Sequence, residues 1–196
     1  ASLTSDIRGG NNAGIRCCWY NPEGLPRPED LRIDYDIRDL NQLRAILAEE
    51  GVALPTPEEA LEQLLLERGM TMSAAESCTG GLLAKRMTDF AGSSAVFAGG
   101  VVSYTNDMKI KVLGVKPETI EAHTVYSHEV AEEMAEGVKA LTGSDLGIGI
   151  TGLAGPADDG VNKVGTVCIG LATPEETLSV KLEIGGKNRL NCIAEL

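Results

Sequence analysis

The spacing of apolar and polar positions after Gly69 switches between a two-residue and a helical period, which predicts alternating strands and helices. Strands are expected over 71–75, 101–105, 146–151, 165–172 and 177–184, and a turn at Pro174 joins the last two as an antiparallel hairpin. Helices are expected over 82–90, from a cap at Asn106 to a stop at Gly114, over 117–123, and over 128–141 with Ser127 as cap. This alternation is typical of a layered α/β fold.

Residues 1–50 follow a different pattern, with short strands over 15–20 and 31–37 and a helix that Asp39 caps, Gln42 completing a capping box. A strand and helix fragment of about 50 residues is too short to bury a core alone. Residues 51–56 are predicted to be a linker. Thr56, Pro57 and Glu59 then begin a helix with a hydroxyl cap, a first-turn proline and an acid. The helix has an apolar face of Leu61, Leu64, Leu65 and Leu66 and ends at Gly69, so a second domain is predicted over 57–196.

Composition and charge narrow the class of function. The chain has 196 residues, 43% of them hydrophobic, and a net charge of −12, which argues against a reader of nucleic acid backbones. No apolar run approaches the length of a membrane span and no signal pattern begins the sequence, so we expect a cytoplasmic protein without a membrane partner. Five cysteines without paired spacing and two histidines predict neither a disulfide framework nor a metal site.

The segment Glu76-Ser77-Cys78-Thr79-Gly80-Gly81 joins a strand to a helix. Such a turn presents a hydroxyl at the carboxyl end of the strand, while backbone N–H groups and the positive helix end face whatever binds there. The alternative is that Ser77 and Thr79 only cap the helix and that the glycines only permit the turn.

Two more turns rich in hydroxyls, amides or glycines follow strands, at 104–106 and at 151–156. Ligands of α/β sheets collect at the carboxyl ends of strands, so the three turns are expected to converge on one crevice. No histidine lies in any of them, which disfavours a Ser-His-Asp triad. Lys109, in the first turn of its helix, is the available base for Ser77; the alternative is a solvated lysine on an amphipathic helix.

A resemblance covers the second domain. The segments 75–84, 92–94, 100–106 with Lys109, 113–115, 151–156 and 164–167 resemble, in order, motifs of the C-terminal domain of the CinA family, which includes nicotinamide-nucleotide amidases. The resemblance implies a three-layer α/β/α sandwich with a mostly parallel mixed sheet. It also implies hydrolysis of nicotinamide mononucleotide to nicotinate mononucleotide and ammonia, with no metal or organic cofactor.

The resemblance also implies roles for single residues. Ser77 would be the nucleophile, Lys109 its general base, and Tyr104 a helper of this dyad. N–H groups around 78–80 would form the oxyanion hole. The substrate-binding positions would be Cys78, Thr79, Gly80, Gly81, Asn106, Thr151, Gly152 and Arg189, the last suited to a phosphate or carboxylate.

Three departures from the family pattern bear on activity. The loop after Pro156 is short and carries Asp158 and Asp159, which would repel a substrate phosphate. Bulkier residues replace a small pair of the family in the segment 123–127. The family continues through a longer last helix than the one that reaches Leu196, so the last helix is expected to be truncated: the chain is either a fragment or needs a partner, with a second copy in a homo-oligomer as the expected one.

The segments 2–14 and 18–22 resemble the end of haloacid-dehalogenase-like phosphatases. In that family an acidic pair helps to hold Mg²⁺; Asp6 matches its second member, and Ala1 stands in place of the first. One carboxylate makes a poor magnesium site, so the fragment 1–50 is not expected to act as a phosphatase. Two alternatives to the amidase remain: a catalytically silent nucleotide-binding or interaction module, and, less favoured, a magnesium-dependent phosphatase.

Overall fold

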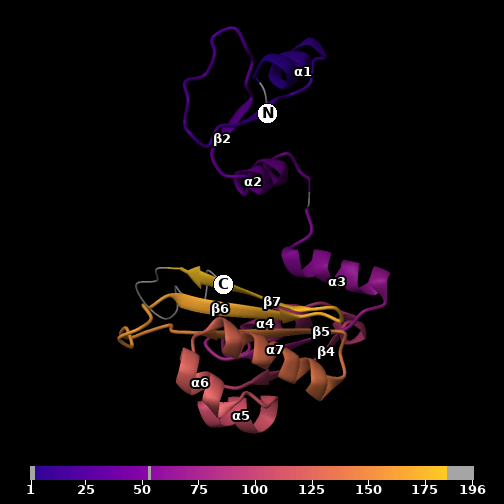
Figure 1. Ribbon diagram of the computed structural model, residues 1–196. Helices are drawn as coiled ribbons and strands as arrows, with labels where there is room; N and C mark the ends of the chain where they lie inside the picture. Colours follow the sequence, from indigo (N-terminus) through magenta and orange to yellow (C-terminus); the bar gives the residue numbers. More distant parts are fainter. Residues whose placement is uncertain (1–2, 53, 185–196) are drawn as a thin grey trace. The chain divides into compact units, whose positions relative to one another are not determined.

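The chain forms two compact units, Ala1–Thr56 and Pro57–Leu196, in a computed structural model that describes residues 3–52 and 54–184 (Figure 1). The second unit contains a five-stranded sheet in the order β4-β3-β5-β6-β7. Its strands are β3 (Met72–Glu76), β4 (Phe97–Val102), β5 (Leu146–Gly152), β6 (Thr166–Ala172) and β7 (Thr177–Glu183).

Strand β3 pairs in parallel with β4 and β5, whereas β6 is antiparallel to both β5 and β7. Four strands therefore run in one direction and β6 runs in the other. The predicted mixed, mostly parallel sheet is confirmed, and so is the hairpin around Pro174.

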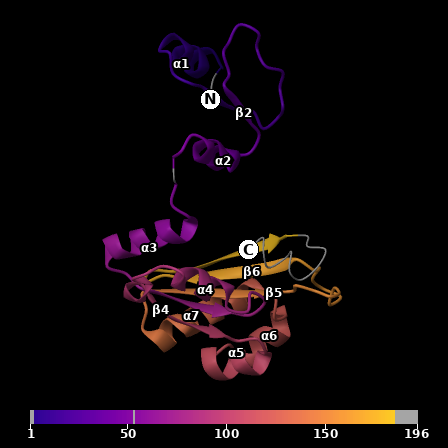
Figure 2. The same ribbon diagram turned by 180° about the vertical axis from the view of Figure 1, so that it is seen from behind.

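Helices cover both faces of this sheet, as Figures 1 and 2 show from opposite sides. Helices α3 (Pro57–Arg68) and α4 (Leu82–Thr88) lie on one face; α5 (Asn106–Leu113), α6 (Pro117–His123) and α7 (His128–Thr142) lie on the other. Successive residues of β3 point to opposite faces: Ala74 packs with Leu65 of α3, and Ala75 packs with Met134 of α7. The predicted three-layer α/β/α architecture is confirmed.

Glycines let α7 lie directly on the sheet. A Cβ atom added at Gly147 or Gly149 of β5 would lie 2.1 or 2.2 Å from the carbonyl oxygen of Ala135 or Ala131 in α7. Gly170 of β6 is equally close, since its added Cβ would lie 2.4 Å from the Ala131 oxygen. These contacts are with helix backbone, which cannot rotate away as a side chain does, so the glycines set the distance between the two layers.

The substitution Gly149→Ala is expected to lower the free energy of unfolding by about 3 kcal/mol, because the new methyl group overpacks a helix–sheet contact. Circular dichroism during denaturant unfolding would measure the change. Gly143→Ala is the control: Gly143 ends α7 with φ 69° and open space around it, so only its backbone strain costs stability, about 1 kcal/mol. Equal losses in the two variants would contradict the packing argument.

Three predicted boundaries of the second unit are wrong by a few residues. Strand β4 starts at Phe97 and stops at Val102, which leaves Tyr104 in the following turn. The cap of α5 is Thr105, whose hydroxyl accepts the N–H of Met108 at 3.2 Å, so the predicted cap Asn106 becomes the first helical residue. Helix α4 ends at Thr88 and not at residue 90.

The predicted apolar face of α3 is only partly buried. Leu65 is buried and Leu61 packs against the same core, but Leu64 and Leu66 are exposed. The sequence places four leucines within six positions, and only one stripe of a helix can face the sheet. The predicted apolar face is therefore divided between a core-facing part with Leu61 and Leu65 and an exposed part with Leu64 and Leu66.

The first unit is built around two short parallel strands, β1 (Cys18–Tyr20) and β2 (Tyr35–Ile37), with a π-helical turn (Leu3–Ile7), α1 (Arg8–Asn12) and α2 (Gln42–Glu49). Asn41 precedes α2 as its cap, so the prediction of Asp39 is wrong. Gln42 nevertheless makes the back-reaching half of the predicted box, because its side-chain oxygen accepts the N–H of Asp39 at 3.1 Å.

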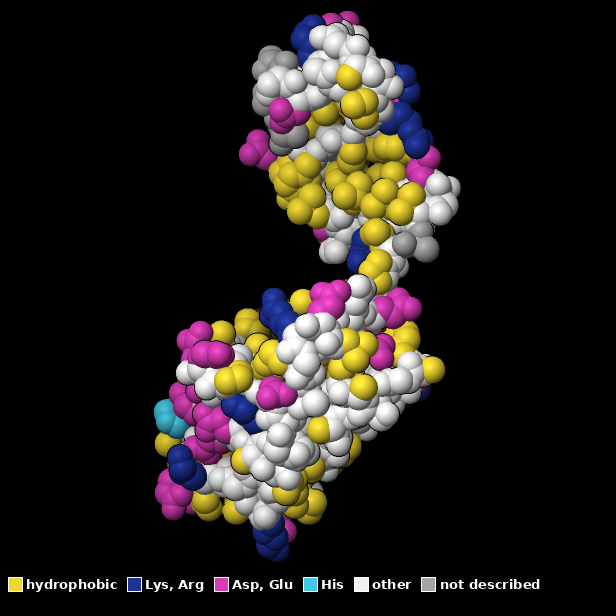
Figure 3. All heavy atoms as spheres, turned by 90° about the vertical axis from the view of Figure 1, so that its right-hand side faces the viewer, with side chains coloured by type: hydrophobic (Ala, Val, Ile, Leu, Met, Phe, Trp, Pro, Cys, Tyr) yellow, Lys and Arg dark blue, Asp and Glu magenta, His cyan; other side chains and the backbone are white. Residues whose placement is uncertain are grey.

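Apolar side chains gather on the surface of this first unit, as Figure 3 shows. The buried cluster consists of Ile7, Cys17 and Trp19, while the exposed large apolar residues are Ile15, Tyr20, Leu25, Leu40, Leu43, Val52 and Leu54. The unit thus exposes more large apolar side chains than its small core buries, as expected for a fragment of this length.

Within the described part of the chain, no helix combines the length and apolar character that crossing a membrane requires.

Candidate active site

The ends of three neighbouring strands bring the predicted turns together. Glu76, the last residue of β3, pairs with Val102 of β4 on one side and with Ile150 of β5 on the other. Ser77 therefore lies in line with Ser103 and Thr151, the residues that follow those partners. The register alone aligns the turns after β3 and β4 with the end of β5, which confirms the predicted convergence.

Lys109 forms hydrogen bonds with residues that follow two of these strands, β3 and β4. Its Nζ atom donates to Ser77 Oγ at 2.9 Å and to the carbonyl oxygen of Ser103 at 2.8 Å. Ser103 is itself fixed, since its N–H donates to the Glu76 carbonyl at 2.8 Å. Among the described residues, the hydrogen bonds of this nitrogen go to two acceptors, the hydroxyl predicted to be the nucleophile and one backbone oxygen.

Burial sets the protonation of this lysine. Lys109 is 1% exposed, so the alternative of a solvated lysine is wrong. Burial lowers its pKa to about 8, although the neighbouring Cys78 thiol acts in the opposite direction. At pH 7 about a tenth of the molecules then carry a neutral amine, against less than about a thousandth for a lysine in water. A lysine in this state can accept a proton.

The N-terminus of α4 is occupied by the protein's own carboxylate. Glu76, 1% exposed, accepts the N–H groups of Gly81 and Leu83 on Oε2, both at 3.1 Å, and that of Ala84 on Oε1 at 2.8 Å. The expectation that this helix end faces a bound anion is therefore wrong: the charge it stabilises belongs to Glu76. The alternative that Ser77 and Thr79 only cap α4 is also wrong, because the cap residue of this helix is Gly81 and no side chain caps it.

A cavity of about 160 Å³ opens beside the Ser77–Lys109 contact. Six of the predicted site residues line it, namely Ser77, Cys78, Tyr104, Asn106, Lys109 and Gly152; Val125, Tyr126, Leu153, Ala154 and Gly155 complete the wall. All three predicted turns contribute, together with the segment between α6 and α7. Tyr104 is 57% exposed and so belongs to the open side of the cavity.

Four of the predicted residues do not line this cavity. Thr79 lines a separate, smaller hollow, and Gly80 and Gly81 shape the turn with φ angles of 64° and 101°. Thr151 is fully buried and donates to the Val125 carbonyl at 2.8 Å, so it supports the wall from behind. Arg189 lies outside the described residues.

Two contributors to the site, Tyr126 and the carbonyl group of Ser103, are not predicted from the sequence. Tyr126 lines the cavity although it lies between two helices, where only its bulk relative to the CinA pattern set it apart. The carbonyl of Ser103 carries no side-chain signal at all. Only the strand register shows that this oxygen lies beside Ser77 and within reach of Lys109.

The carboxylates of Asp158 and Asp159 accept hydrogen bonds from backbone N–H groups of the loop that contains them. Asp159 Oδ1 accepts the N–H groups of Val161 and Asn162 at 2.8 and 2.6 Å, which holds the pKa of Asp159 below its usual range. Asp158 accepts the N–H of Val164 at 2.7 Å. The carboxylates therefore have a structural role in the loop in addition to the repulsion predicted for them.

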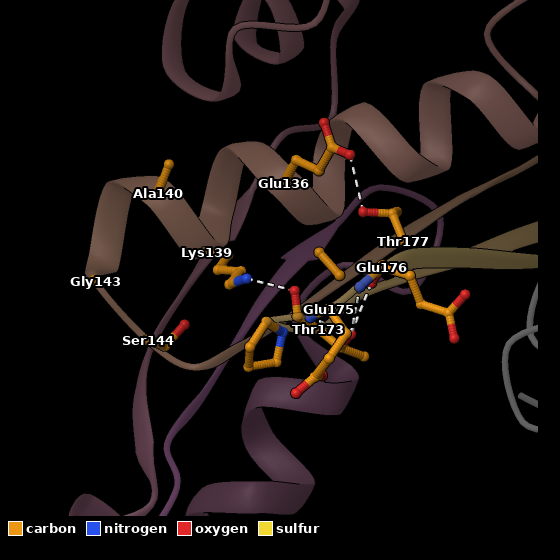
Figure 4. A pocket seen from close by; sticks show the side chains of 11 residues that line it. Glu136, Lys139, Ala140, Gly143, Ser144, Thr173, Glu175, Glu176 and Thr177 are labelled. Carbon is orange, nitrogen blue, oxygen red and sulfur yellow. Dashed lines mark hydrogen bonds between the residues drawn. The ribbon is translucent and has the colours of Figure 1, made fainter.

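A larger hollow of about 470 Å³ lies at the hairpin turn, between the end of α7 and the loop joining β6 to β7 (Figure 4). Lys139 donates to the Thr173 carbonyl and Thr177 donates to Glu136, so these side chains tie the turn to the helix. Two of the titratable groups there, Lys139 and Glu136, are thus bound to partners that hold the turn, whereas Glu175 and Glu176 are exposed to solvent. The smaller cavity at Ser77 is therefore the better candidate for chemistry.

Among the described residues, no group of three or more His, Cys, Asp and Glu side chains is arranged to hold a metal ion. Asp6, the residue that matches a magnesium ligand of the phosphatase family, accepts the Ser5 hydroxyl at 2.9 Å.

Residues 55–195 match the model of the family described as CinA C-terminal domain. The chain belongs to the CinA family. Residues 1–54 lie outside this match, so their resemblance to haloacid-dehalogenase-like phosphatases stays a prediction.

Relatives and solved structures agree with this assignment. A CinA-like protein of Chlorobaculum tepidum is 44% identical over 158 residues, which cover 78% of this chain and 37% of that protein. The chain spans about a third of the length of the curated relatives it matches.

Two solved structures are similar over most of their own length. The competence damage-inducible protein A of Klebsiella pneumoniae is 31% identical with a TM-score of 0.68, over 70% of this chain and 86% of that one. The competence/damage inducible protein of Agrobacterium tumefaciens is 33% identical with a TM-score of 0.64, over 73% and 91%.

Proposed function

We propose that the second unit is an amidohydrolase that converts nicotinamide mononucleotide to nicotinate mononucleotide and ammonia. The observation that carries the proposal is the 2.9 Å contact between Ser77 Oγ and Lys109 Nζ at the wall of a small cavity. A buried lysine with a pKa of about 8 is poised to take a proton from serine near neutral pH.

The proposed reaction has two halves. In the first, neutral Lys109 accepts the Ser77 hydroxyl proton as Oγ attacks the carboxamide carbon; the C–N bond then breaks and the leaving nitrogen takes that proton from Lys109 as ammonia forms. In the second, Lys109 accepts a proton from water, whose oxygen attacks the Ser77 ester, and the proton returns to Oγ as the nicotinate is released. One water is consumed and the dyad is restored.

The negative oxygen of the tetrahedral intermediate needs N–H donors. Within the predicted stretch 78–80, the N–H of Gly80 already donates to the Ser77 carbonyl at 3.2 Å. The proposed oxyanion hole therefore belongs to the beginning of the turn, before Gly80. Tyr104 and Asn106, at the same cavity, are proposed to orient the dyad and the substrate.

Ammonia release tests the proposal. The full chain is expected to release ammonia from nicotinamide mononucleotide, and Ser77→Ala is expected to reduce kcat by at least about 10³-fold, because the nucleophile is lost. Ser73→Ala is the control: Ser73 is a buried serine of β3, the strand that precedes Ser77, and its hydroxyl lies 2.8 Å from the hydroxyl of Ser144, away from the cavity. Undiminished turnover in Ser77→Ala would refute the dyad. Calorimetric binding of the mononucleotide without turnover would support the silent binding module instead.

A further inference from the structure

The connection between α6 and α7 contains a strained residue. Thr124 has φ 67° and ψ 163°, and among the described residues it is the one non-glycine with a positive φ. This region of backbone space is normally open to glycine alone, and a β-branched side chain makes it more unfavourable. The Thr124 hydroxyl accepts the side-chain N–H of Asn162 at 3.2 Å, which helps to hold the conformation.

The two residues after Thr124 are held just as firmly. The carbonyl of Val125 accepts the Thr151 hydroxyl at 2.8 Å, and the carbonyl of Tyr126 accepts the Cys168 thiol at 3.5 Å. Thr151 and Cys168 are direct partners in the β5–β6 ladder. Three successive residues are thus fastened by side chains of the sheet and of the loop after it, and strain persists only where the surroundings over-determine it in this way.

The fastened segment forms one wall of the candidate active site. Val125 and Tyr126 line the cavity together with Ser77 and Lys109, and Tyr104 lines it from the turn after β4. Burial raises the pKa of Tyr126, with smaller contributions from neighbouring acidic groups, so the phenol stays protonated and neutral near pH 7. The segment that carries this neutral phenol is therefore held by hydrogen bonds at Thr124, Val125 and Tyr126 beside the Ser77–Lys109 contact.

We propose that Tyr126 is a specificity-determining residue that recognises a positively charged aromatic ring next to the carboxamide. The face of a tyrosine ring attracts cations and stacks with flat rings, and the attraction of a cation strengthens as the two groups lose contact with water. The proposal rests on the proposed function, because it concerns the same cavity. It adds that the site distinguishes a pyridinium ring from the uncharged dihydropyridine of the reduced mononucleotide.

Binding without turnover tests the proposal. In a Ser77→Ala background, calorimetry gives the ratio of the Kd for reduced nicotinamide mononucleotide to that for the oxidised form. The ratio is expected to exceed about ten, to persist in Tyr126→Phe, and to fall by about three- to tenfold in Tyr126→Ala. Leu153→Ala is the matched control, because it enlarges the same cavity without removing an aromatic ring. It should weaken both ligands and leave the ratio unchanged.

Thr124→Gly tests the strained backbone separately. Glycine adopts the observed angles freely but also leaves them freely, so the ratio should fall even though Tyr126 is intact. The inference is overturned if Tyr126→Ala leaves the Kd ratio of the Ser77→Ala protein unchanged, whatever the amidase assay shows. It is also overturned if the Ser77→Ala protein binds neither ligand. If ammonia is not released but the ratio still depends on Tyr126, the proposed reaction fails and the inference stands.

Discussion

Replacing Lys109 with methionine is expected to lower kcat for ammonia release by about 10³-fold at pH 7, the scale of a lost general base. Methionine has nearly the same length and suits a buried position, but it cannot accept the Ser77 proton. Lys111→Met is the control, because Lys111 lies one half-turn further along α5, is exposed, and pairs with Asp107. Comparable activity losses in both variants would show that the helix, and not the amine, matters.

The pH profile of the parent chain belongs to the same prediction. The base must be neutral to act, so kcat/KM should rise with pH and level off above an apparent pKa of about 8. The residual kcat/KM of Lys109→Met should not increase with pH in this way. A parent profile that is flat between pH 6 and 9 would contradict the assignment of Lys109 as the base.

Stability measurements distinguish a loss of catalysis from a loss of folding in the Lys109→Met variant. The pKa of Lys109 is lower in the folded protein than in the unfolded chain, so the unfolded state binds the proton more tightly. The free energy of unfolding should therefore rise with pH between about 8 and the ordinary lysine pKa of 10.5, and the cost of the buried charge is fully present below 8. Lys109→Met removes that cost, and its melting temperature at pH 7 should not fall below that of the parent.

The sequence predicted the architecture and the main site because both depend on local patterns. Periodicity and cap signals located every β-strand and α-helix of the second unit but not the 3-10 helix Ser93–Ala95, and the hydroxyl and glycine turns after three strands indicated one crevice. The strand-to-helix turn points to Ser77, the absence of histidine from the turns points to Lys109 as its base, and the resemblance to the CinA family implies the same pair. Their contact at 2.9 Å requires only that the turn after β3 lie beside the first turn of α5.

What the sequence did not predict depends on register and backbone. The Ser103 carbonyl meets Lys109 only because Glu76 pairs with Val102. Tyr126 reaches the cavity because Thr124 adopts an unfavourable φ, which no rule based on residue preference would assign to threonine. The boundary of β4 was missed because Gly99 and Gly100 hide the start of the strand, where Phe97 pairs with Met72.

Removal of the Glu76 carboxylate should have the largest effect on folding. Glu76→Ala leaves three backbone N–H groups at the start of α4 without their acceptor, in a place where the carboxylate is 1% exposed. Each unpaired buried group costs about 1–3 kcal/mol, and partial access of water lowers the sum to about 4 kcal/mol. Since Ser77 directly follows Glu76, the nucleophile should be displaced together with the helix.

Glu76→Gln isolates the contribution of charge. The amide keeps one oxygen acceptor and nearly the same shape but loses the negative charge at the positive end of the helix, so a smaller loss of about 2 kcal/mol is expected. Circular dichroism during urea unfolding should show the order parent, Glu76→Gln, Glu76→Ala. If the alanine variant is as stable as the parent, the carboxylate does not hold α4 against the end of β3.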